Sequence, residues 1–546
     1  MNAAVQTIAS TPFDDQQVGT AGLRKQVRVF QQPHYLENFI QSVFDTYPGF
    51  EGSTLVVGGD GRYHNDVAIQ TLLAMAAARG IARVIVGKNG LLSTPAASHL
   101  IRKYDAHGGF VLSASHNPAG PDGDFGIKFS VRGGGQAPST LTDAIYARSR
   151  AITAYQRLDV PPVDLGQVSE TRLGGMTVQV VDSTQDYADL METQFDFDAI
   201  RSLLDSGFQF AFDAMHAVTG PYARELFVHR LGAPESVLRN AVPQSDFGGG
   251  HPDPNLVYAA QLADEVVTRQ ALDFAAASDG DGDRNMILGR GLFVSPGDSL
   301  AVIAANARCM PGHRDGIAGA ARSMPTSRAL DAVAARQGFE AHETPTGWKF
   351  FCNLLDAGRI HVCGEESFGT GSDHVREKDG LWAVLAWLNL LASRPGQSVA
   401  DIMLDHWSTY GRHYYERHDY EGLKAEDAEE VMDALRQQLS QLPGQQFDTL
   451  TVTAADEFAY VDPIDGSQAK GQGLRVIFGD TARIVLRKSG TGTSGATLRL
   501  YLEWLREDQW ELRLPTQEVL TPLAVIADRL CRLKAITGRD QPSLVT

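Results

Sequence analysis

The sequence is poor in cysteine, in basic charge and in long apolar runs, and each shortage excludes a class of protein. Its formal net charge of −18 leaves it without the basic excess on which nucleic-acid binding depends. No run approaches the roughly 18 apolar residues of a membrane span, and residues 1–17 lack the basic and apolar regions of a signal peptide. Only four cysteines occur, without any C-x-x-C pair: Cys309, Cys352, Cys363 and Cys531. We therefore expect buried, reduced thiols in a cytoplasmic protein that binds neither nucleic acid nor membrane.

Length and composition indicate a globular protein of several domains. At roughly 100–200 residues per domain, the 546 residues predict three to four domains. The hydrophobic content of 43% and the charged content of 21% are ordinary for a soluble chain. The acidic balance does not exclude an anionic substrate, because substrate binding depends on the lysines and arginines near the site. We expect residues 1–17 to form a loose lead-in.

The first two thirds of the chain alternate strand and helix patterns. Residues 53–62, 82–88 and 108–115 are short apolar runs typical of buried strands, and residues 65–81 have helical periodicity. Similar units recur further along, at 208–232, 271–288 and 321–369. This βαβ patterning predicts mostly parallel sheets, each with a Gly/Ser/Asp-rich loop after an apolar strand. Ligands of such sheets lie beyond the carboxyl ends of the strands.

The last part of the chain has a different pattern. Residues 481–504 read as two alternating strands around a glycine-rich loop, and a helix is expected from about Pro522. This segment predicts a separate α+β domain. We place domain boundaries near residues 180, 302 and 407, which gives domains 1–180, 181–302, 303–407 and 408–546.

The loop SASHNP, residues 113–118, has two interpretations. Ser115 follows a buried strand and can present its hydroxyl to a ligand, with Lys128 nearby in sequence. The G-x-S-x-G elbow of a hydrolase does not fit, because Ser113 and Asn117 replace its glycines. His116 adjoins Ser115, which is poor geometry for the base of a triad. A nucleophile and an inert polar turn remain equally open from this loop alone.

Three aspartates alternate in the loop SDGDGDRN, residues 278–285. A turn can converge Asp279, Asp281 and Asp283 on one hard cation. An EF-hand is excluded, because its sixth and twelfth positions hold Arg284 and Arg290 here. Apolar residues on both sides argue against a solvated acidic loop, and close carboxylates repel without a cation. We predict a site for one divalent metal, Mg²⁺.

Two further loops carry polar groups suited to a sugar phosphate. Residues 364–380 combine carboxylates and hydroxyls with the cations Arg376 and Lys378; a mobile surface loop is the alternative.

Residues 487–495 match G-x-G-x-x-G, but the strand that follows excludes a dinucleotide fold. A hairpin that exposes backbone N–H groups, with Arg487 at its mouth, would bind an anion; an inert hairpin is the alternative. The four loops together suggest phosphoryl transfer on a sugar phosphate in a cleft between domains.

These segments resemble the phosphoglucomutases of the α-D-phosphohexomutase superfamily. SASHNP, DGDGDR, GEESFGTGSDH and RKSGTGTSG are jointly specific, and the match extends from Gly19 to near Trp504. The long sugar loop resembles that of the glucose-type enzymes. The resemblance implies an α/β fold of four domains around a central cleft, with three related α/β domains of mixed sheets and a C-terminal α+β domain.

The resemblance also implies roles for individual residues. Ser115 would be carried as phosphoserine and would hold Mg²⁺, one ion per chain, together with Asp279, Asp281 and Asp283. His116, Lys128 and Lys378 are the other catalytic candidates, and Lys128 is the first candidate for the general acid or base. The candidate substrate-binding residues are Thr20, Arg24, Arg284, Thr346, Gly347, Glu365, Ser367, Lys378, Arg487, Ser489, Gly490, Thr491, Gly492 and Arg499.

The implied activity is the interconversion of glucose 1-phosphate and glucose 6-phosphate, with glucose 1,6-bisphosphate as intermediate and activator. The partner is a small-molecule hexose phosphate, and we expect a monomer, with a dimer as the alternative. Ser113, Ala119 and Lys488 depart from the usual family pattern. None of them removes a chemical group that the reaction needs. Ala119 and Lys488 lie where loop flexibility or phosphate affinity would respond.

Overall fold

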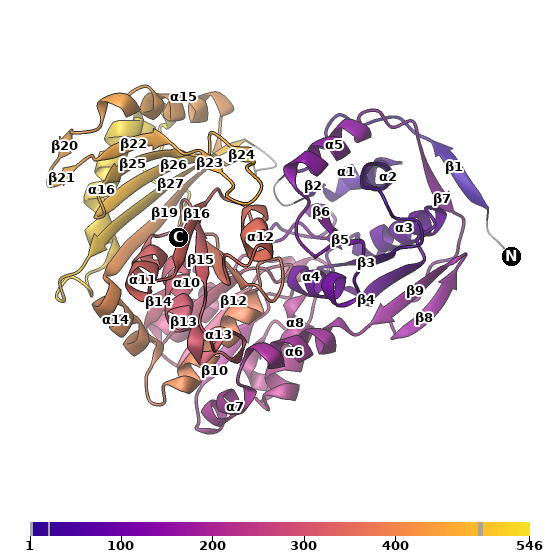
Figure 1. Ribbon diagram of the computed structural model, residues 1–546, viewed down its shortest axis with the longest axis horizontal. Helices are drawn as coiled ribbons and strands as arrows, with labels where there is room; N and C mark the ends of the chain where they lie inside the picture. The colour runs from indigo at the N-terminus through magenta and orange to yellow at the C-terminus, as the bar shows by residue number, and fades with distance from the viewer. Residues whose placement is uncertain (1–3, 20–21, 490–494) are drawn as a thin grey trace. The chain divides into compact units, whose positions relative to one another are not determined.

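The computed structural model describes residues 4–19, 22–489 and 495–546. The chain forms two compact units, each assembled from separate stretches of sequence (Figure 1). Unit 1 comprises Met1–Phe293, Asn306–Gly316 and Ser367–Val399. Unit 2 comprises Val294–Ala305, Ile317–Glu366 and Ala400–Thr546. We describe each unit by itself.

A seven-stranded mixed sheet organises the N-terminal part of unit 1. Its central strands β5, β3, β4 and β9 are parallel, whereas β6 and β2 at one edge and β8 at the other are antiparallel to their neighbours. This confirms the predicted mixed sheet. In spatial order the strands are β2 (Leu23–Gln26), β6 (Asp124–Val131), β5 (Gly108–Leu112), β3 (Thr54–Gly59), β4 (Arg83–Leu91), β9 (Met176–Val181) and β8 (Ser169–Leu173).

Helices cover both faces of this sheet, as crossover connections between parallel strands require. Figure 1 shows α4 on one side and α2 and α5 on the other. Helix α4 begins where the Ser93 hydroxyl accepts a hydrogen bond from the Ala96 N–H, with a proline in its first turn. The helices are α2 (Tyr35–Thr46), α3 (Asn65–Ala78), α4 (Thr94–Lys103) and α5 (Ser139–Ser149).

A second sheet in unit 1 carries the acidic loop. Strand β10 (Phe210–Asp213) pairs in parallel with β11 (Leu238–Arg239) and with β12 (Phe274–Ser278). Strand β13 (Asn285–Gly289) runs antiparallel to β12, so residues 279–284 connect the two as the sequence predicts. Every residue of β12 and β13 is buried. Helices α6 (Ser183–Gln194), α7 (Phe197–Asp205), α8 (Thr219–Ala223) and α13 (Gly380–Ser393) and strand β18 (Gly369–Ser372) complete this part of the unit.

Unit 2 contains a small parallel sheet and a larger antiparallel one. In the first, β15 (Gly319–Ser323) pairs with β16 (Glu340–Thr344) and with β17 (Val362–Glu365). Helices α10 (Pro296–Ala305), α11 (Ala329–Gln337) and α12 (Lys349–Asp356) belong to it. The antiparallel sheet has the order β22 (Ala454–Glu457), β25 (Leu474–Phe478), β26 (Ala482–Ser489), β27 (Ala496–Arg506), β19 (Arg412–Leu423) and β28 (Leu544–Val545).

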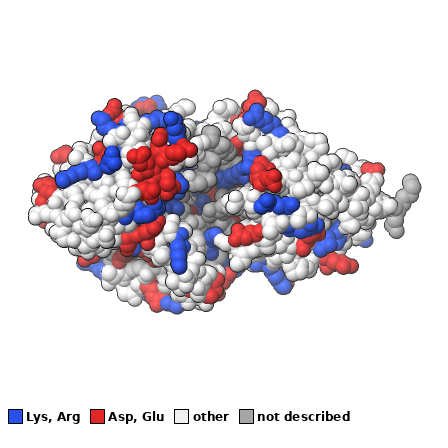
Figure 2. Space-filling view, turned by 90° about the horizontal axis from the view of Figure 1, so that it is seen from above, with Lys and Arg blue, Asp and Glu red and all other residues white. Residues whose placement is uncertain are grey.

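Helices α15 (Ala425–Arg436) and α16 (Thr516–Cys531) lie against the antiparallel sheet (Figure 1). Together with the sheet they confirm the α+β architecture expected for the C-terminal region. Acidic side chains gather on part of the face that carries α15, while acidic and basic residues are scattered among uncharged ones over the rest of the visible surface (Figure 2). Among the described residues, no helix combines the length and the apolar character that a bilayer crossing needs.

Three local expectations were wrong. Residues Val5–Ala9 form strand β1, paired with β7 (Ala154–Leu158), where a loose lead-in was expected. Helix α16 begins six residues before Pro522, because Val519 and Leu520 extend its buried stripe upstream of the proline. Cys309 is partly exposed, whereas the other three cysteines are buried as expected; all four are free thiols.

Candidate active site

The SASHNP loop holds Ser115 in a strained conformation at the carboxyl end of β5. Ser115 has φ = 52°, in the left-handed region that costs a side chain energy. Its N–H donates to the Ser113 hydroxyl at 2.7 Å, and its own hydroxyl donates to Asp279 Oδ2 at 2.8 Å. A Cβ on Gly280 would lie 2.3 Å from the Ser115 carbonyl oxygen, so only glycine permits this approach. The loop is therefore built to bring Ser115 to the acidic loop.

A buried ion pair holds the strained backbone in place. Arg62 Nη2 donates to the Ser115 carbonyl at 2.7 Å, and Nη1 donates to the Asp124 carbonyl at 2.8 Å. Its Nε donates to Asp60 Oδ2 at 2.9 Å, and neither side chain is exposed. The sequence interpretation missed both residues. Their signal is the GGDGR run at the end of β3, which adjoins β5 in the sheet.

We expect Arg62→Met to destabilise unit 1 by about 3–5 kcal/mol, because it leaves the Asp60 carboxylate buried and unpaired. The Asp60→Asn/Arg62→Met double variant should regain part of that loss, since no uncompensated charge stays buried. Urea unfolding of the wild type, each single variant and the double variant measures the difference. Strictly additive losses in the double variant would contradict this account of the pair.

The three predicted metal ligands converge. One carboxylate oxygen from each of Asp279, Asp281 and Asp283 lies within 4.8 Å of the others, and all three residues are buried. Gly282, at φ = 81°, permits the tight turn between them. Asp281 Oδ1 and Asp283 Oδ1 are buried and accept no hydrogen bond from any described residue. Three anionic groups with two orphaned oxygens fit a divalent cation.

The pKa shifts of these aspartates also indicate a cation site. Burial, together with the charges of Asp283 and Asp281, raises the pKa of Asp279 well above its usual range. Burial alone would also raise the pKa of Asp281, but Lys128, Thr94 and Arg24 lower it. Without a cation, the three carboxylates repel one another. A bound cation would relieve that repulsion, so the geometry suits a metal centre.

Lys128 lies beside the three aspartates and donates hydrogen bonds to one of them and to Thr94. Its Nζ donates to Asp281 Oδ2 at 2.8 Å and to Thr94 Oγ1 at 2.9 Å. Burial would lower its pKa, but the charges of Asp281, Glu377 and Asp283 outweigh burial and raise it. The side chain is thus held protonated. A lysine whose pKa is raised holds its proton, so this geometry suits Lys128 to neutralising negative charge rather than to accepting a proton.

The structure adds residues that sequence reasoning missed. Thr94 starts helix α4 and binds both Lys128 and Asp281. Burial raises the pKa of Glu377 to about 7, against the opposing charge of Lys128, and Gln136 Nε2 donates to Glu377 Oε2 at 3.0 Å. Thr94 has no local sequence signal. Glu377 lies in the loop 364–380, but nothing in the sequence distinguishes it from its neighbours.

The remaining unit 1 candidates surround the same aspartates. Lys378 Nζ is 3.5 Å from Asp283 Oδ2, and the Arg284 N–H donates to Asp279 Oδ1 at 3.0 Å. Arg24 on β2 is half-buried; desolvation lowers its pKa, and the charge of Asp281 opposes the shift. His116 Nδ1 is 3.3 Å from Ser115 Oγ. Ser367 belongs to unit 1 and is 9% exposed.

Unit 2 brings together three of the predicted sugar-binding residues. The Gly347 N–H donates to Glu365 Oε1 at 2.8 Å, and Gly347 has φ = 124°. The Thr346 hydroxyl is buried and has no hydrogen-bond partner among the described residues. The Glu365 carboxylate and the Thr346 hydroxyl are both groups that suit sugar hydroxyls.

The predicted phosphate residues also converge in unit 2. Strands β26 and β27 form an antiparallel hairpin that places Arg487 opposite Arg499 and Ser489 opposite Thr497. The hairpin confirms that the glycine-rich loop is not of the dinucleotide type. Thr20, Gly490, Thr491 and Gly492 lie outside the described residues.

Comparisons with known proteins cover nearly the whole chain. Models of the phosphoglucomutase/phosphomannomutase α/β/α domains I, II and III match residues 15–156, 185–291 and 296–410. A model of the phosphoglucomutase-1 C-terminal domain matches residues 412–543. The four matches confirm the predicted set of three α/β domains and a distinct C-terminal domain.

Individual relatives agree with the domain matches. A phosphoglucomutase of Rhizobium radiobacter is 56% identical over 99% of this chain and 100% of its own length. One of Schizosaccharomyces pombe is 50% identical over 99% of this chain and 100% of its own. The open form of parafusin, a phosphoglucomutase of Paramecium, superposes with a TM-score of 0.92 at 45% identity, covering 100% of this chain and 99% of its own. The chain belongs to the phosphoglucomutase family of the α-D-phosphohexomutase superfamily.

Proposed function

We propose that this protein interconverts glucose 1-phosphate and glucose 6-phosphate through a phosphoserine at position 115. The observation that carries the proposal is the contact of the Ser115 hydroxyl, on a strained backbone, with Asp279 in a cluster of three buried aspartates. The other two aspartates each have one oxygen that accepts no hydrogen bond from the described residues. Reactive groups and buried like charges are concentrated in this way at active sites. We further propose a cytoplasmic monomer whose domains meet near residues 180, 302 and 407.

Asp279, Asp281, Asp283 and an oxygen of phosphorylated Ser115 would hold Mg²⁺. When bound, the ion would neutralise negative charge on the transferring phosphoryl group. The two orphaned oxygens in the aspartate group supply ligand positions without breaking any hydrogen bond among described residues. The short contact from Ser115 Oγ to Asp279 places the phosphorylated residue at the same group.

The chain's own residues account for group transfer. The bond between phosphorus and Ser115 Oγ breaks as a bond forms to the free hydroxyl oxygen of the bound sugar phosphate. The proton that the sugar hydroxyl loses must reach the released Ser115 Oγ, and His116 Nδ1, 3.3 Å from that oxygen, is placed to deliver it. Lys128, held protonated by its carboxylate neighbours, would stabilise the negative charge on the transferring oxygens. Arg24, Arg284 and Lys378 add positive charge around the same group.

The resulting glucose 1,6-bisphosphate must turn over, so that its other phosphate is transferred back to Ser115. Glu365, Ser367, Thr346 and Gly347 are suited to grip sugar hydroxyls in either orientation. Arg487, Ser489 and Arg499, with the glycine-rich loop, would bind whichever phosphate is not reacting. Guanidinium and backbone N–H groups recognise charge and geometry rather than the carbon that carries the phosphate.

Two classes of alternative compete with this proposal, one that shares the fold and the reactive residues and one that lacks catalysis. A mutase with another preferred hexose, or a bisphosphate synthase that releases its intermediate, would use the same residues. A catalytically inactive sugar-phosphate-binding scaffold would not need the buried carboxylate group or the strained serine.

Coupled assays with glucose, mannose and glucosamine 1-phosphates separate these possibilities. We expect the fastest turnover with glucose 1-phosphate and a purified protein whose intact mass exceeds the sequence mass by one phosphoryl group, located at Ser115. Faster turnover of mannose 1-phosphate would overturn the substrate assignment. Accumulation of free bisphosphate would favour a synthase, and no turnover of any substrate would favour the scaffold.

A further inference from the structure

Glu366 is a buried carboxylate that the proposed reaction does not use. It follows the sugar-binding candidate Glu365 and is 3% exposed. Tyr501 Oη donates to its Oε1 at 3.2 Å, and Ser323 Oγ donates to its Oε2 at 3.2 Å. Its backbone N–H donates to Thr326 Oγ1 at 2.8 Å. Burying a carboxylate costs free energy, and the hydrogen bonds to both of its oxygens offset part of that cost. A buried carboxylate held in this way is therefore a candidate for a role in positioning its partners.

The contact with Tyr501 leads to the predicted phosphate site. Arg487 Nη1 donates to Tyr501 Oη at 3.4 Å, while the same hydroxyl donates to Glu366. Burial raises the pKa of Tyr501, so the phenol stays neutral and can donate and accept at once. Arg487 Nε donates to the Gln472 carbonyl at 3.1 Å. A Cβ on Gly473 would lie 2.7 Å from Arg487 Cγ, so the glycine leaves room for this side chain.

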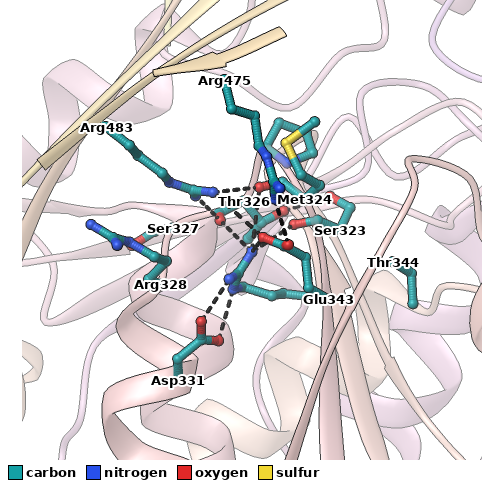
Figure 3. A network of polar contacts seen from close by, with 12 residues as sticks. Ser323, Met324, Thr326, Ser327, Arg328, Asp331, Glu343, Thr344, Arg475 and Arg483 are labelled. Carbon is teal, nitrogen blue, oxygen red and sulfur yellow. Dashed lines mark hydrogen bonds and ion pairs between the residues drawn. The ribbon is translucent and has the colours of Figure 1, made fainter. Parts of the chain in front are cut away.

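The other side of Glu366 is held by the segment 323–327. Ser323 Oγ and Thr326 Oγ1 are 2.7 Å apart and both contact Glu366. Figure 3 shows Arg483 directed toward this segment, with Glu343 and Arg475 directed toward each other beside it. Arg483 donates to the carbonyls of Met324, at 2.7 Å, and Thr326. The segment is thus held by Arg483 of β26, which lies 157 to 159 positions further along the chain than the carbonyls it binds.

The charges around Glu366 agree with a fixed role. Burial would raise its pKa, but Arg417, Arg487 and Arg499 lower it, so it is ionised. Arg417 and Arg499 also face Asp419, at 2.9 and 3.6 Å. Two carboxylates thus stand among three arginines, which leaves a net positive charge for an incoming phosphate.

We propose that Glu366 is a positioning residue that, through Tyr501, fixes the Arg487 guanidinium for the phosphate that does not react. Because Glu366 adjoins Glu365 in the chain, the same residue sets the spacing between the sugar contact and the phosphate contact. The proposal rests on the proposed function, which makes Arg487 a phosphate ligand. Glu366 itself touches neither substrate nor the transferring group.

Tyr501→Phe tests the relay without changing charge. We expect KM for glucose 1-phosphate and for glucose 6-phosphate to rise about tenfold, with kcat within about threefold of the wild type. The reason is that the non-reacting phosphate is bound equally in the ground and transition states. A merely structural defect would lower kcat through loss of active protein and would leave KM unchanged.

Tyr415→Phe is the matched control. Tyr415 packs on the same cluster as Tyr501, and its hydroxyl donates to the Pro325 carbonyl at 2.9 Å rather than to Glu366. It should lose comparable stability and keep its KM. An equal rise of KM in both phenylalanine variants would assign the effect to packing and overturn the proposal.

Glu366→Gln and the Glu366→Gln/Tyr501→Phe double variant complete the cycle. If both residues act on Arg487 through one path, KM of the double variant should match that of the worse single variant, whereas independent effects multiply. A fall in KM for Glu366→Gln would show that Glu366 merely competes with phosphate for the arginines, and would overturn the proposal.

Arg487→Met separates this inference from the proposed function. If Arg487→Met leaves KM unchanged, the phosphate-site assignment itself fails. If it raises KM while Tyr501→Phe does not, only the positioning role of Glu366 fails.

Discussion

Ser115→Ala should lower kcat by about 10⁴-fold or more, the effect expected when a covalent nucleophile is removed. The variant should also lose the additional phosphoryl mass of the wild-type protein. Its fold should persist, because the Ser115 hydroxyl makes few contacts, to Asp279 and His116, while the loop backbone is held by Arg62 and Ser113. Initial rates in a coupled assay, intact mass and a thermal melt measure the three outcomes.

Ser42→Ala is the control for the substitution itself. Ser42 is a fully buried serine of the same unit, on helix α2, and its hydroxyl donates to the Asn38 carbonyl at 2.7 Å. It should lose a little stability and no activity. Substantial residual turnover in Ser115→Ala, with no phosphoryl group on any other residue, would remove Ser115 from the reaction.

The sequence predicted those parts of the molecule that depend on local pattern. The alternation of β3, α3, β4 and β5 follows from hydrophobic periodicity. The carboxylate loop between β12 and β13 follows from three aspartates at alternate positions. The glycine-rich hairpin could be told from a dinucleotide loop because the residues after it alternate like a strand. Position at a strand end was enough to suggest which loops carry chemistry.

Residues that act across the fold could not be predicted in this way. Arg62 holds Ser115 across 53 positions, and Thr94 meets Asp281 across 187. Tyr501 and Glu366 are 135 positions apart. Each is an ordinary residue in its own segment and acquires its role only from contacts that form when distant parts of the chain fold together. Helix α16 extends upstream of Pro522 because tertiary burial of Val519 and Leu520 overrides the local signal.

Substituting one of the three clustered aspartates should have opposite effects on activity and on stability. Asp279→Asn should lower kcat/KM by about 10³-fold, since several kcal/mol of charge stabilisation are lost with the metal. The same change removes one of three buried, mutually repelling carboxylates, whose repulsion and burial raise the pKa of Asp279. The metal-free variant should therefore melt at a higher temperature than the metal-free wild type. Thermal melts in EDTA and in excess Mg²⁺, with initial rates under both conditions, provide the measurement.

The control distinguishes the metal group from burial of a carboxyl in general. Asp298 is also buried, and burial raises its pKa, but it lies in unit 2 and accepts a hydrogen bond from the Trp407 indole. Asp298→Asn should keep the Mg²⁺-dependent rise in melting temperature, which Asp279→Asn should lose. An Asp279→Asn protein that still gains stability from Mg²⁺ would place the ion elsewhere. A metal-free Asp279→Asn protein that melts below the metal-free wild type would show that hydrogen bonds from Ser115 and the Arg284 N–H, rather than repulsion, dominate the energetics of this carboxylate.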